Sequence, residues 1–233
     1  MTEVDINVRI RKFLSSALRD IGAGNYDGAI EHLRAAEVLD PENPETLFNL
    51  GISYCRKEMF LEAIDLFSKV IALPRSSVDI LTVLKLISYC LVRLESYEQA
   101  LVHAGEGLSL MPDDTVLLNL AGFANEKLDR VPQALAHYRK ILEIDPDNAN
   151  ARNSLAYIMA WTGTDLSAAL EHAKAALKAS PENPAYLDTL GVVYLKKGNP
   201  DQARQHLKKA LSLMPESREI KNHINMLLKI QGK

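Results

Sequence analysis

Histidines are the side chains of this 233-residue chain that first suggest chemistry, because imidazole binds metal ions and transfers protons near neutral pH. Five of the six are spaced regularly along the chain: His32, His103, His137, His172 and His206. A zinc site needs several ligands that each lie about 2.1 Å from one ion. Regular spacing predicts instead one histidine in each of several similar units, so we expect no metal site. A stripe of histidines that gains charge near about pH 6 stays open as an alternative.

Other residues that could do chemistry do not form a catalytic pattern. Cys55 and Cys90 are the only two cysteines and form no CxxC pair, which favours a reduced, cytoplasmic setting. Gly22-Ala23-Gly24 lacks the strand-turn-helix context of a dinucleotide-binding loop. The carboxylates of Asp113-Asp114 and Asp145-Pro146-Asp147 are expected in turns, as caps of helices. We therefore expect no enzyme and no cofactor.

Composition narrows the possible partners. The net charge is −3 and the isoelectric point is near 6.1, whereas a dedicated nucleic-acid-binding chain usually has a basic excess. No run of 18 apolar residues is present, so we expect no direct membrane insertion. The first residues contain no apolar core of a signal peptide, which also favours a cytoplasmic location unless the sequence is a piece of a longer chain.

Two residue types repeat with one period and indicate how the chain is built. Alanines recur with gaps of 34, 37, 34, 35 and 34 residues at Ala29, Ala63, Ala100, Ala134, Ala169 and Ala203. Prolines recur with gaps of 33, 38, 34, 35 and 34 residues at Pro41, Pro74, Pro112, Pro146, Pro181 and Pro215. A shared period in two residue types predicts one supersecondary unit written about six times.

Each period contains two helical patterns. In the last one, Leu187, Leu190-Gly191 and Tyr194 lie on one face of a first helix, and Ala203 and Leu207 lie on one face of a second. Small residues occupy one fixed place in every first helix: Ala17, Gly51, Ser88, Gly122, Ala156 and Gly191. Small side chains that face the alanine series allow two antiparallel helices to approach closely.

These residues match the tetratricopeptide signature W-x2-L-G-x2-Y…A-x3-F…P, and the chain resembles that family, with a bacterial character in its last two units. The resemblance implies an all-α fold, a right-handed superhelical solenoid of antiparallel helix pairs that forms a single domain over residues 1–233. The expected repeats span residues 10–43, 44–77, 81–114, 115–148, 149–183 and 184–217. Residues 218–233 are expected to form a capping helix that buries Ile220, Ile224 and either Leu227 or Leu228.

The resemblance also implies where a partner would bind. First helices of the family line a concave groove, and ten residues match groove positions: Phe48, Lys85, Tyr89, Arg93, Asn119, Phe123, Lys127, Asn153, Tyr157 and Trp161. Aromatic rings offer apolar contact at low entropic cost, and asparagine amides can pair with a peptide backbone. We expect a non-catalytic scaffold that docks a peptide or helix of another protein, with acidic residues favoured by the cations.

Three functional alternatives follow from the same pattern. The carboxylate clamp with which some family members hold chaperone tails is absent, because Lys85 fits it but Tyr89, Leu120, Asn150 and Ser154 do not. A self-assembling structural subunit, with the chain as a homo-oligomer, stays open. A chaperone-like holder of a secretion, pilus or envelope component also stays open.

Overall fold

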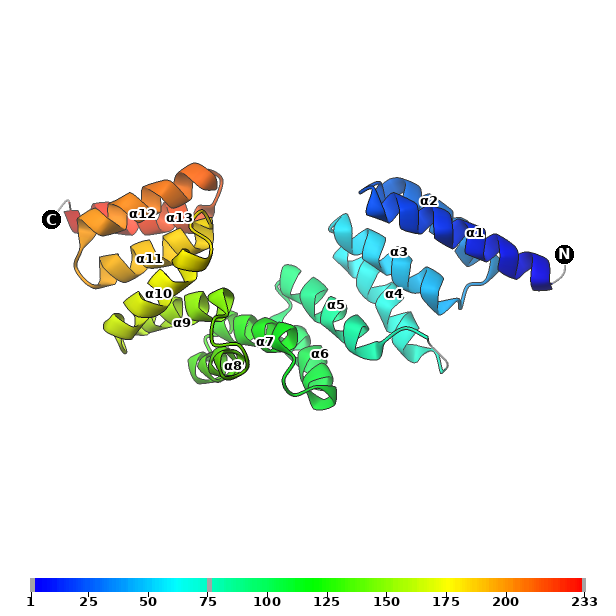
Figure 1. Ribbon diagram of the computed structural model, residues 1–233, viewed down its shortest axis with the longest axis horizontal. Helices are drawn as coiled ribbons and strands as arrows, with labels where there is room; N and C mark the ends of the chain where they lie inside the picture. The colour runs from blue at the N-terminus through cyan, green and yellow to red at the C-terminus, as the bar shows by residue number, and fades with distance from the viewer. Residues whose placement is uncertain (1–2, 75–76, 232–233) are drawn as a thin grey trace. The chain divides into compact units, whose positions relative to one another are not determined.

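The computed structural model describes residues 3–74 and 77–231, and this part of the chain is built from α-helices without a β-strand (Figure 1). Two compact units follow one another along the sequence, Met1–Ala124 and Asn125–Lys233. The N-terminal unit contains α1 (Glu3–Gly22), α2 (Tyr26–Leu39), α3 (Pro44–Arg56), α4 (Phe60–Ala72), α5 (Ile80–Arg93), α6 (Tyr97–Leu110) and most of α7 (Thr115–Lys127). The C-terminal unit contains α8 (Val131–Ile144), α9 (Ala149–Thr162), α10 (Leu166–Ala179), α11 (Pro184–Lys196), α12 (Pro200–Leu213) and α13 (Arg218–Gln231).

The described helices follow the expected order of about six pairs and a terminal helix. Consecutive helices pack together within each unit, as α1 does on α2 and α11 on α12. The all-α prediction and the prediction of paired helices are confirmed. Two parts of the expected elements, residues 75–76 of the second repeat and 232–233 of the terminal helix, lie outside the described residues.

Asparagine and proline fix where several first helices begin. The side chain of Asn43 accepts a hydrogen bond of 2.9 Å from the backbone N–H of Thr46, and Pro44 follows at the first helical position. Asn183 and Pro184 repeat this arrangement at the start of α11. An N-cap of this kind stabilises a helix by about 1 kcal/mol, and proline at the first position loses no hydrogen bond. The expected caps are confirmed at both places.

A left-handed residue reverses the chain within each pair. The turn between the two helices contains one residue with a positive φ of 57–76°: Gly24, Glu58, Glu95, Asp129, Gly163 or Gly198. Glycine adopts this conformation without strain, whereas the three acidic residues carry a steric cost there. The turn at Glu58 holds that carboxylate beside Arg93 at the end of α5.

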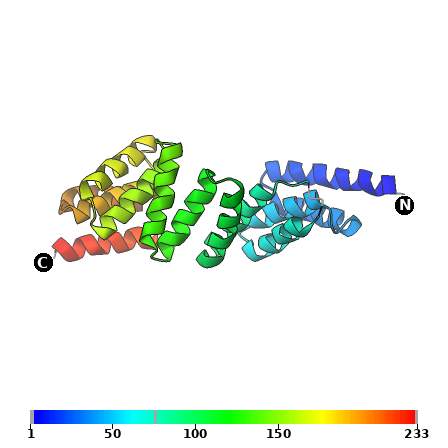
Figure 2. The same ribbon diagram turned by 90° about the horizontal axis from the view of Figure 1, so that it is seen from below.

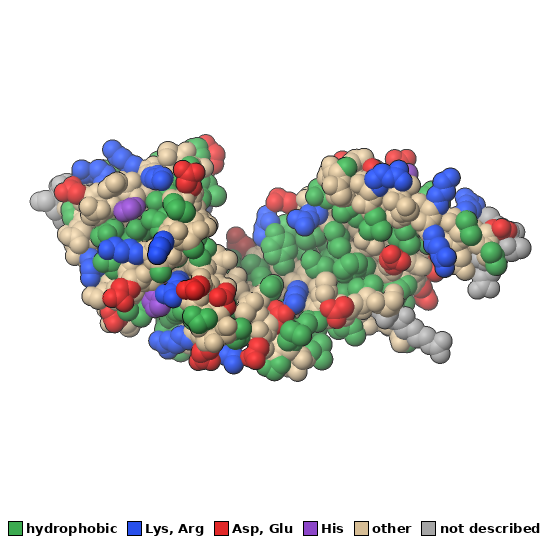
Figure 3. Space-filling view, in the orientation of Figure 1, with side chains coloured by type: hydrophobic (Ala, Val, Ile, Leu, Met, Phe, Trp, Pro, Cys, Tyr) green, Lys and Arg blue, Asp and Glu red, His purple; other side chains and the backbone are tan. Residues whose placement is uncertain are grey.

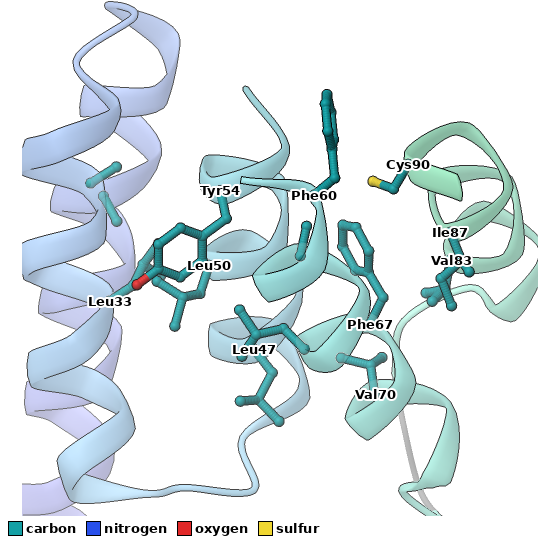
Figure 4. Close-up of a cluster of buried hydrophobic side chains, with 14 of the residues drawn as sticks. Leu33, Leu47, Leu50, Tyr54, Phe60, Phe67, Val70, Val83, Ile87 and Cys90 are labelled. Carbon is teal, nitrogen blue, oxygen red and sulfur yellow. The ribbon is translucent and has the colours of Figure 1, made fainter. Parts of the chain in front are cut away.

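The core of the N-terminal unit is packed around small residues, as the sequence predicted. Leu33, Leu50, Phe67 and Ile87 are fully buried between neighbouring helix pairs (Figure 4). A Cβ atom added to Gly51 would lie only 2.6 Å from a ring carbon of Phe67, so α3 and α4 approach each other at a distance that only glycine permits.

The core of the C-terminal unit is closed by α13, which lies along one face of that unit (Figure 2). Ile220 and Leu227 are buried, with exposed fractions of 3% and 2%, while Leu228 is 57% exposed. The expected capping helix is therefore present, and Leu227 is the leucine that it buries. This helix also buries His223, a residue that the sequence analysis left unassigned.

Candidate functional site

Helices α3 and α5 present the candidate binding residues of the N-terminal unit. Leu47, Leu50 and Tyr54 bury one side of α3, so that Ile52 and Arg56 remain on its other side. The equivalent side of α5 carries Leu86, Tyr89 and Arg93, which lie at helical spacings of three and four residues. Hydrophobic side chains gather over α3 and α5 in the space-filling view (Figure 3).

A pocket of about 420 Å³ lies between these two helices, and we call it the N-terminal pocket. Its lining consists of Ile52, Cys55, Arg56, Glu58, Leu86, Tyr89 and Arg93. Apolar groups and two guanidinium groups therefore share one concave surface. Small polar-rimmed pockets of this kind are the usual places where a ligand side chain is buried.

Arg93 is held firmly within this pocket. Its guanidinium donates hydrogen bonds of 2.8 Å to the carboxylate of Glu58 and 2.9 Å to the hydroxyl of Tyr89. It also lies over the ring of Phe60, 4.8 Å from the centroid, where a cation–π contact adds to the attraction. These hydrogen bonds raise the pKa of Arg93 further above its ordinary value, so the group stays charged.

The other cation expected in this unit, Lys85, is already paired. Its ammonium lies 2.5 Å from the carboxylate of Asp114, which is only 8% exposed. Asp114 also caps α7, because its side chain accepts hydrogen bonds from the backbone N–H groups of Val116 and Leu117. Lys85 thus compensates a buried carboxylate, and its charge is neutralised within the chain.

The remaining expected residues of the N-terminal unit are half-buried. Phe48 packs against Phe67 with ring centroids 6.0 Å apart. Phe123 packs edge-on against Tyr97 at 6.2 Å. Asn119 is half-buried on α7. Tyr89, at 38% exposed, therefore offers the most accessible aromatic surface among the expected residues of this unit.

The C-terminal unit has a second pocket, of about 410 Å³, which we call the C-terminal pocket. It is lined by Glu126, Lys127, Asp129, Val131, Tyr157, Ile158, Trp161 and Thr162. Trp161 is 40% exposed and packs edge-on against Tyr157 with centroids 6.0 Å apart. The ammonium of Lys196 lies 4.3 Å from the centre of the Trp161 ring, so this ring already attracts a cation.

Helix α13 contacts the same aromatic residues from the side. The hydroxyl of Tyr157 donates a hydrogen bond of 3.1 Å to Glu219, and the ring of His223 lies 5.9 Å from that of Trp161. Burial and the nearby charge of Glu219 raise the pKa of Tyr157, so its hydroxyl stays protonated. Asn153 is half-buried one helical turn before Tyr157, on α9.

A buried hydrogen-bonded pair, absent from the sequence-based expectation, fixes α13. The Nδ1 of His223 lies 2.8 Å and 2.9 Å from the two carboxylate oxygens of Asp188, and both side chains are buried. Burial raises the pKa of Asp188, an effect that the hydrogen bond from His223 partly offsets. The sequence signal was available, since His223 falls between Ile220 and Leu227 on the buried stripe of α13.

The described histidines and carboxylates are dispersed over the helices. Within residues 3–74 and 77–231, no group of three or more His, Cys, Asp or Glu side chains could hold a metal ion. His137, His172 and His206 are half-buried on successive second helices, where burial lowers the pKa of each. The same described residues contain no helix long and apolar enough to cross a membrane.

Sequence models of one repeat family match most of this architecture. A model described as TPR repeat matches residues 22–58, and two described as tetratricopeptide repeat match residues 120–184 and 163–222. The TPR repeat-containing protein PA4667 of Pseudomonas aeruginosa is 32% identical over 130 residues, which make up 56% of this chain and 22% of that protein. The chain therefore spans less than a quarter of the length of this relative.

Solved structures share the fold at low sequence identity. A tetratricopeptide repeat protein from Parabacteroides merdae has a TM-score of 0.80 at 18% identity, over 96% of this chain and 87% of that one. PilW, described as a widely conserved type IV pilus biogenesis factor, has a TM-score of 0.73 at 17% identity, over 96% of this chain and 100% of that one. At such identities the likeness establishes a common fold.

Proposed function

The chain is a tetratricopeptide repeat protein, whose fold serves as a protein–protein interaction scaffold, and we propose that it binds a peptide or helical segment of another protein in its groove. The observation that carries this proposal is the composition of the N-terminal pocket. Apolar side chains and guanidinium groups line one cavity large enough for a side chain of a partner. A non-catalytic role agrees with this surface.

The N-terminal pocket favours an acidic residue next to an apolar one. Arg93 is held in position by Glu58 and Tyr89, and Arg56 has no carboxylate within ion-pair distance among the described residues. A carboxylate of the partner can pair with Arg56 while its apolar neighbour packs on Leu86 and Tyr89. A hydrogen bond to a charged group contributes about 1.5–3 kcal/mol, which corresponds to about a tenfold to hundredfold change in affinity.

The C-terminal pocket favours a different side chain. Glu126 and Asp129 line it together with Trp161 and Tyr157, so carboxylates here meet an aromatic surface. We expect this pocket to take an apolar or basic residue, because the rings of Tyr157 and Trp161 share its lining with the carboxylates. We therefore assign the acidic preference expected from the sequence to the N-terminal pocket as part of this proposal.

Selection of linear peptides tests the proposal. Random peptides displayed on phage would be selected on the full chain, and the affinity of the selected peptides would be measured by fluorescence anisotropy. Acidic residues beside apolar ones should be enriched, and Arg56→Ala or Tyr89→Ala should weaken binding about tenfold or more. Lys69→Ala is the matched control, since it removes an exposed cation of the same unit outside the pocket.

Two results would contradict the proposal. One is a selection without any excess of acidic residues. The other is an equal affinity of the wild type, Arg56→Ala and Tyr89→Ala for the selected peptides, with the helical content of the variants preserved. Either result would mean that the N-terminal pocket is not the binding site.

A second candidate function is that of an assembly factor for a pilus or envelope component. The supporting observation is that PilW matches this chain over the whole of its own length. Co-expression with a candidate component would test it, because such a component should stay soluble only in the presence of the chain.

The unpaired thiols of Cys55 and Cys90 agree better with a cytoplasmic location, which we propose for this protein.

A further inference from the structure

The two cysteines of the chain lie side by side. Cys55 is on α3 and Cys90 on α5, 35 residues later, so they lie on the first helices of neighbouring repeats. Their sulfur atoms are 3.6 Å apart, and the thiol of Cys90 donates a hydrogen bond to the sulfur of Cys55. Figure 4 shows the sulfur of Cys90 pointing away from α5 toward the neighbouring helix pair. Both cysteines belong to the N-terminal unit.

The two thiols differ in access and in charge. Cys90 is fully buried, whereas Cys55 is half-buried and lines the N-terminal pocket. The hydrogen bond from Cys90 and the nearby guanidinium groups of Arg56 and Arg93 lower the pKa of Cys55 to about 7, against the opposing effect of burial. The same hydrogen bond and burial raise the pKa of Cys90. Cys55 is therefore the nucleophile of the pair, because the thiolate is the reactive form.

We propose that Cys55 and Cys90 form a peroxide-reactive dithiol site, which is oxidised reversibly to a disulfide that joins α3 to α5. This proposal is independent of the docking function, since it rests on the two sulfur atoms and the cations beside them. Buried cysteines elsewhere often act only as small apolar side chains. Here Cys55 lines the N-terminal pocket, and the buried sulfur of Cys90 lies within 3.6 Å of the Cys55 sulfur.

The reaction balances with hydrogen peroxide as the oxidant. The thiolate of Cys55 attacks one peroxide oxygen, the O–O bond breaks, and hydroxide leaves while Cys55 becomes a sulfenic acid. The sulfur of Cys90, which gives up its proton, then attacks the sulfur of Cys55, and the S–OH bond breaks with release of water. Overall, two thiols and one peroxide give one disulfide and two waters.

The fold requires only a small movement for the second step. A disulfide bond is about 2.05 Å long, so the sulfur atoms must approach each other by about 1.5 Å from their present separation. Rotation about the Cα–Cβ bond of either cysteine moves its sulfur atom over such distances. The product also removes the thiolate from beside Arg56 and Arg93, and a thiol reductant restores it.

Oxidation of the reduced full chain with one equivalent of hydrogen peroxide tests the site. The wild type should lose the mass of two hydrogens and run as a single chain on a non-reducing gel. After denaturation neither cysteine should react with iodoacetamide, and dithiothreitol should restore both thiols. Cys90→Ser should instead accumulate a sulfenic acid at Cys55 that dimedone labels. Cys55→Ser should leave Cys90 unreacted under the same conditions, because that thiol is buried.

A further variant separates reactivity from folding. Cys90→Ser keeps a hydrogen-bond donor beside Cys55, whereas Cys90→Ala removes it, so alkylation of Cys55 at neutral pH should be up to about tenfold slower in Cys90→Ala. Circular dichroism of each variant confirms that the helices are kept. The proposal is overturned if peroxide-treated wild type still carries two alkylatable thiols when it is denatured before alkylation. It is also overturned if the disulfide forms only between chains, or if Cys90 reacts as fast as Cys55.

Discussion

Replacement of Gly51 with alanine should destabilise the N-terminal unit, although alanine is the better helix former. The added Cβ would lie 2.6, 2.9 and 3.0 Å from three ring atoms of Phe67, which is fully buried. Overpacking of a core in this way costs about 1–3 kcal/mol. The gain of alanine over glycine in a helix is about 0.5–1 kcal/mol. The free energy of unfolding should therefore fall by about 1 kcal/mol.

Gly105 provides the matched control for this prediction. It lies within α6 of the same unit, and a Cβ added there meets nothing within 4 Å. Gly105→Ala should therefore raise the free energy of unfolding by about 0.5–1 kcal/mol, so the two alanine variants should move in opposite directions. Urea unfolding followed by circular dichroism measures both changes, provided that the slope m is the same for all three proteins.

One outcome would refute the reasoning about close helix approach. If Gly51→Ala stabilises the unit as much as Gly105→Ala does, then the ring of Phe67 gives way at no cost, and the period of small residues is not a requirement of packing. A second substitution at the equivalent place extends the test to the other unit. The Cβ of Gly191→Ala would lie 2.7 Å from a side-chain atom of Leu207 and 3.3 Å from its backbone nitrogen, and the same loss is expected.

Three further predictions concern titratable side chains that are buried or half-buried. Asp114→Ala removes both the α7 cap and the partner of Lys85 and should lower the free energy of unfolding in urea by about 2–4 kcal/mol. Asp114→Asn keeps the cap and should lower it less. Equal losses would contradict separate capping and ion-pairing roles of Asp114. His223→Ala leaves the carboxylate of Asp188 buried without its donor and should speed amide hydrogen exchange in α13, and unchanged exchange would refute that role. The third prediction concerns three histidines whose pKa is lowered by burial in the folded chain: His137, His172 and His206. Because the unfolded chain then binds more protons, their contribution to stability is fully present above about pH 6.5 and is lost as the pH falls. Glutamine at all three positions should flatten the dependence of the melting temperature on pH. An unchanged dependence of the melting temperature on pH would contradict the assignment.

The sequence predicted those parts of the fold that local rules determine. The alanine series predicted the buried face of each second helix, and Ala63 and Ala169 are indeed fully buried. Asn43-Pro44 predicted a capped helix start at the observed residue. Such features repeat with the period, so each copy supports the interpretation of the others.

The electrostatic state of the candidate site could not be predicted in this way. Lys85 was placed on the groove face from its register, but its pairing with Asp114 depends on how the next helix begins, which the register does not specify. The hydrogen bond of Arg93 to Glu58 depends on a left-handed turn in the preceding repeat. The binding role of these residues stays a prediction for the peptide experiment.

The cap was the least predictable part of the C-terminal unit. The alanine and proline series that set the register end at Ala203 and Pro215, so they predicted no role for His223. Its burial follows from the packing of α13 on α11, which brings it to Asp188. An ionisable residue on an otherwise apolar stripe was the signal that could have directed attention there.

Contacts between neighbouring repeats link residues that lie about one period apart. Cys55 and Cys90 are 35 residues apart, and so are Asp188 and His223. The members of these pairs are not equivalent positions, because the alanine series places equivalent residues 37 apart in the two repeats that carry the cysteines. Each contact therefore joins two different positions of adjacent units. A thiol pair or a charged pair can thus exist at one junction of the solenoid while the other junctions keep their own residues.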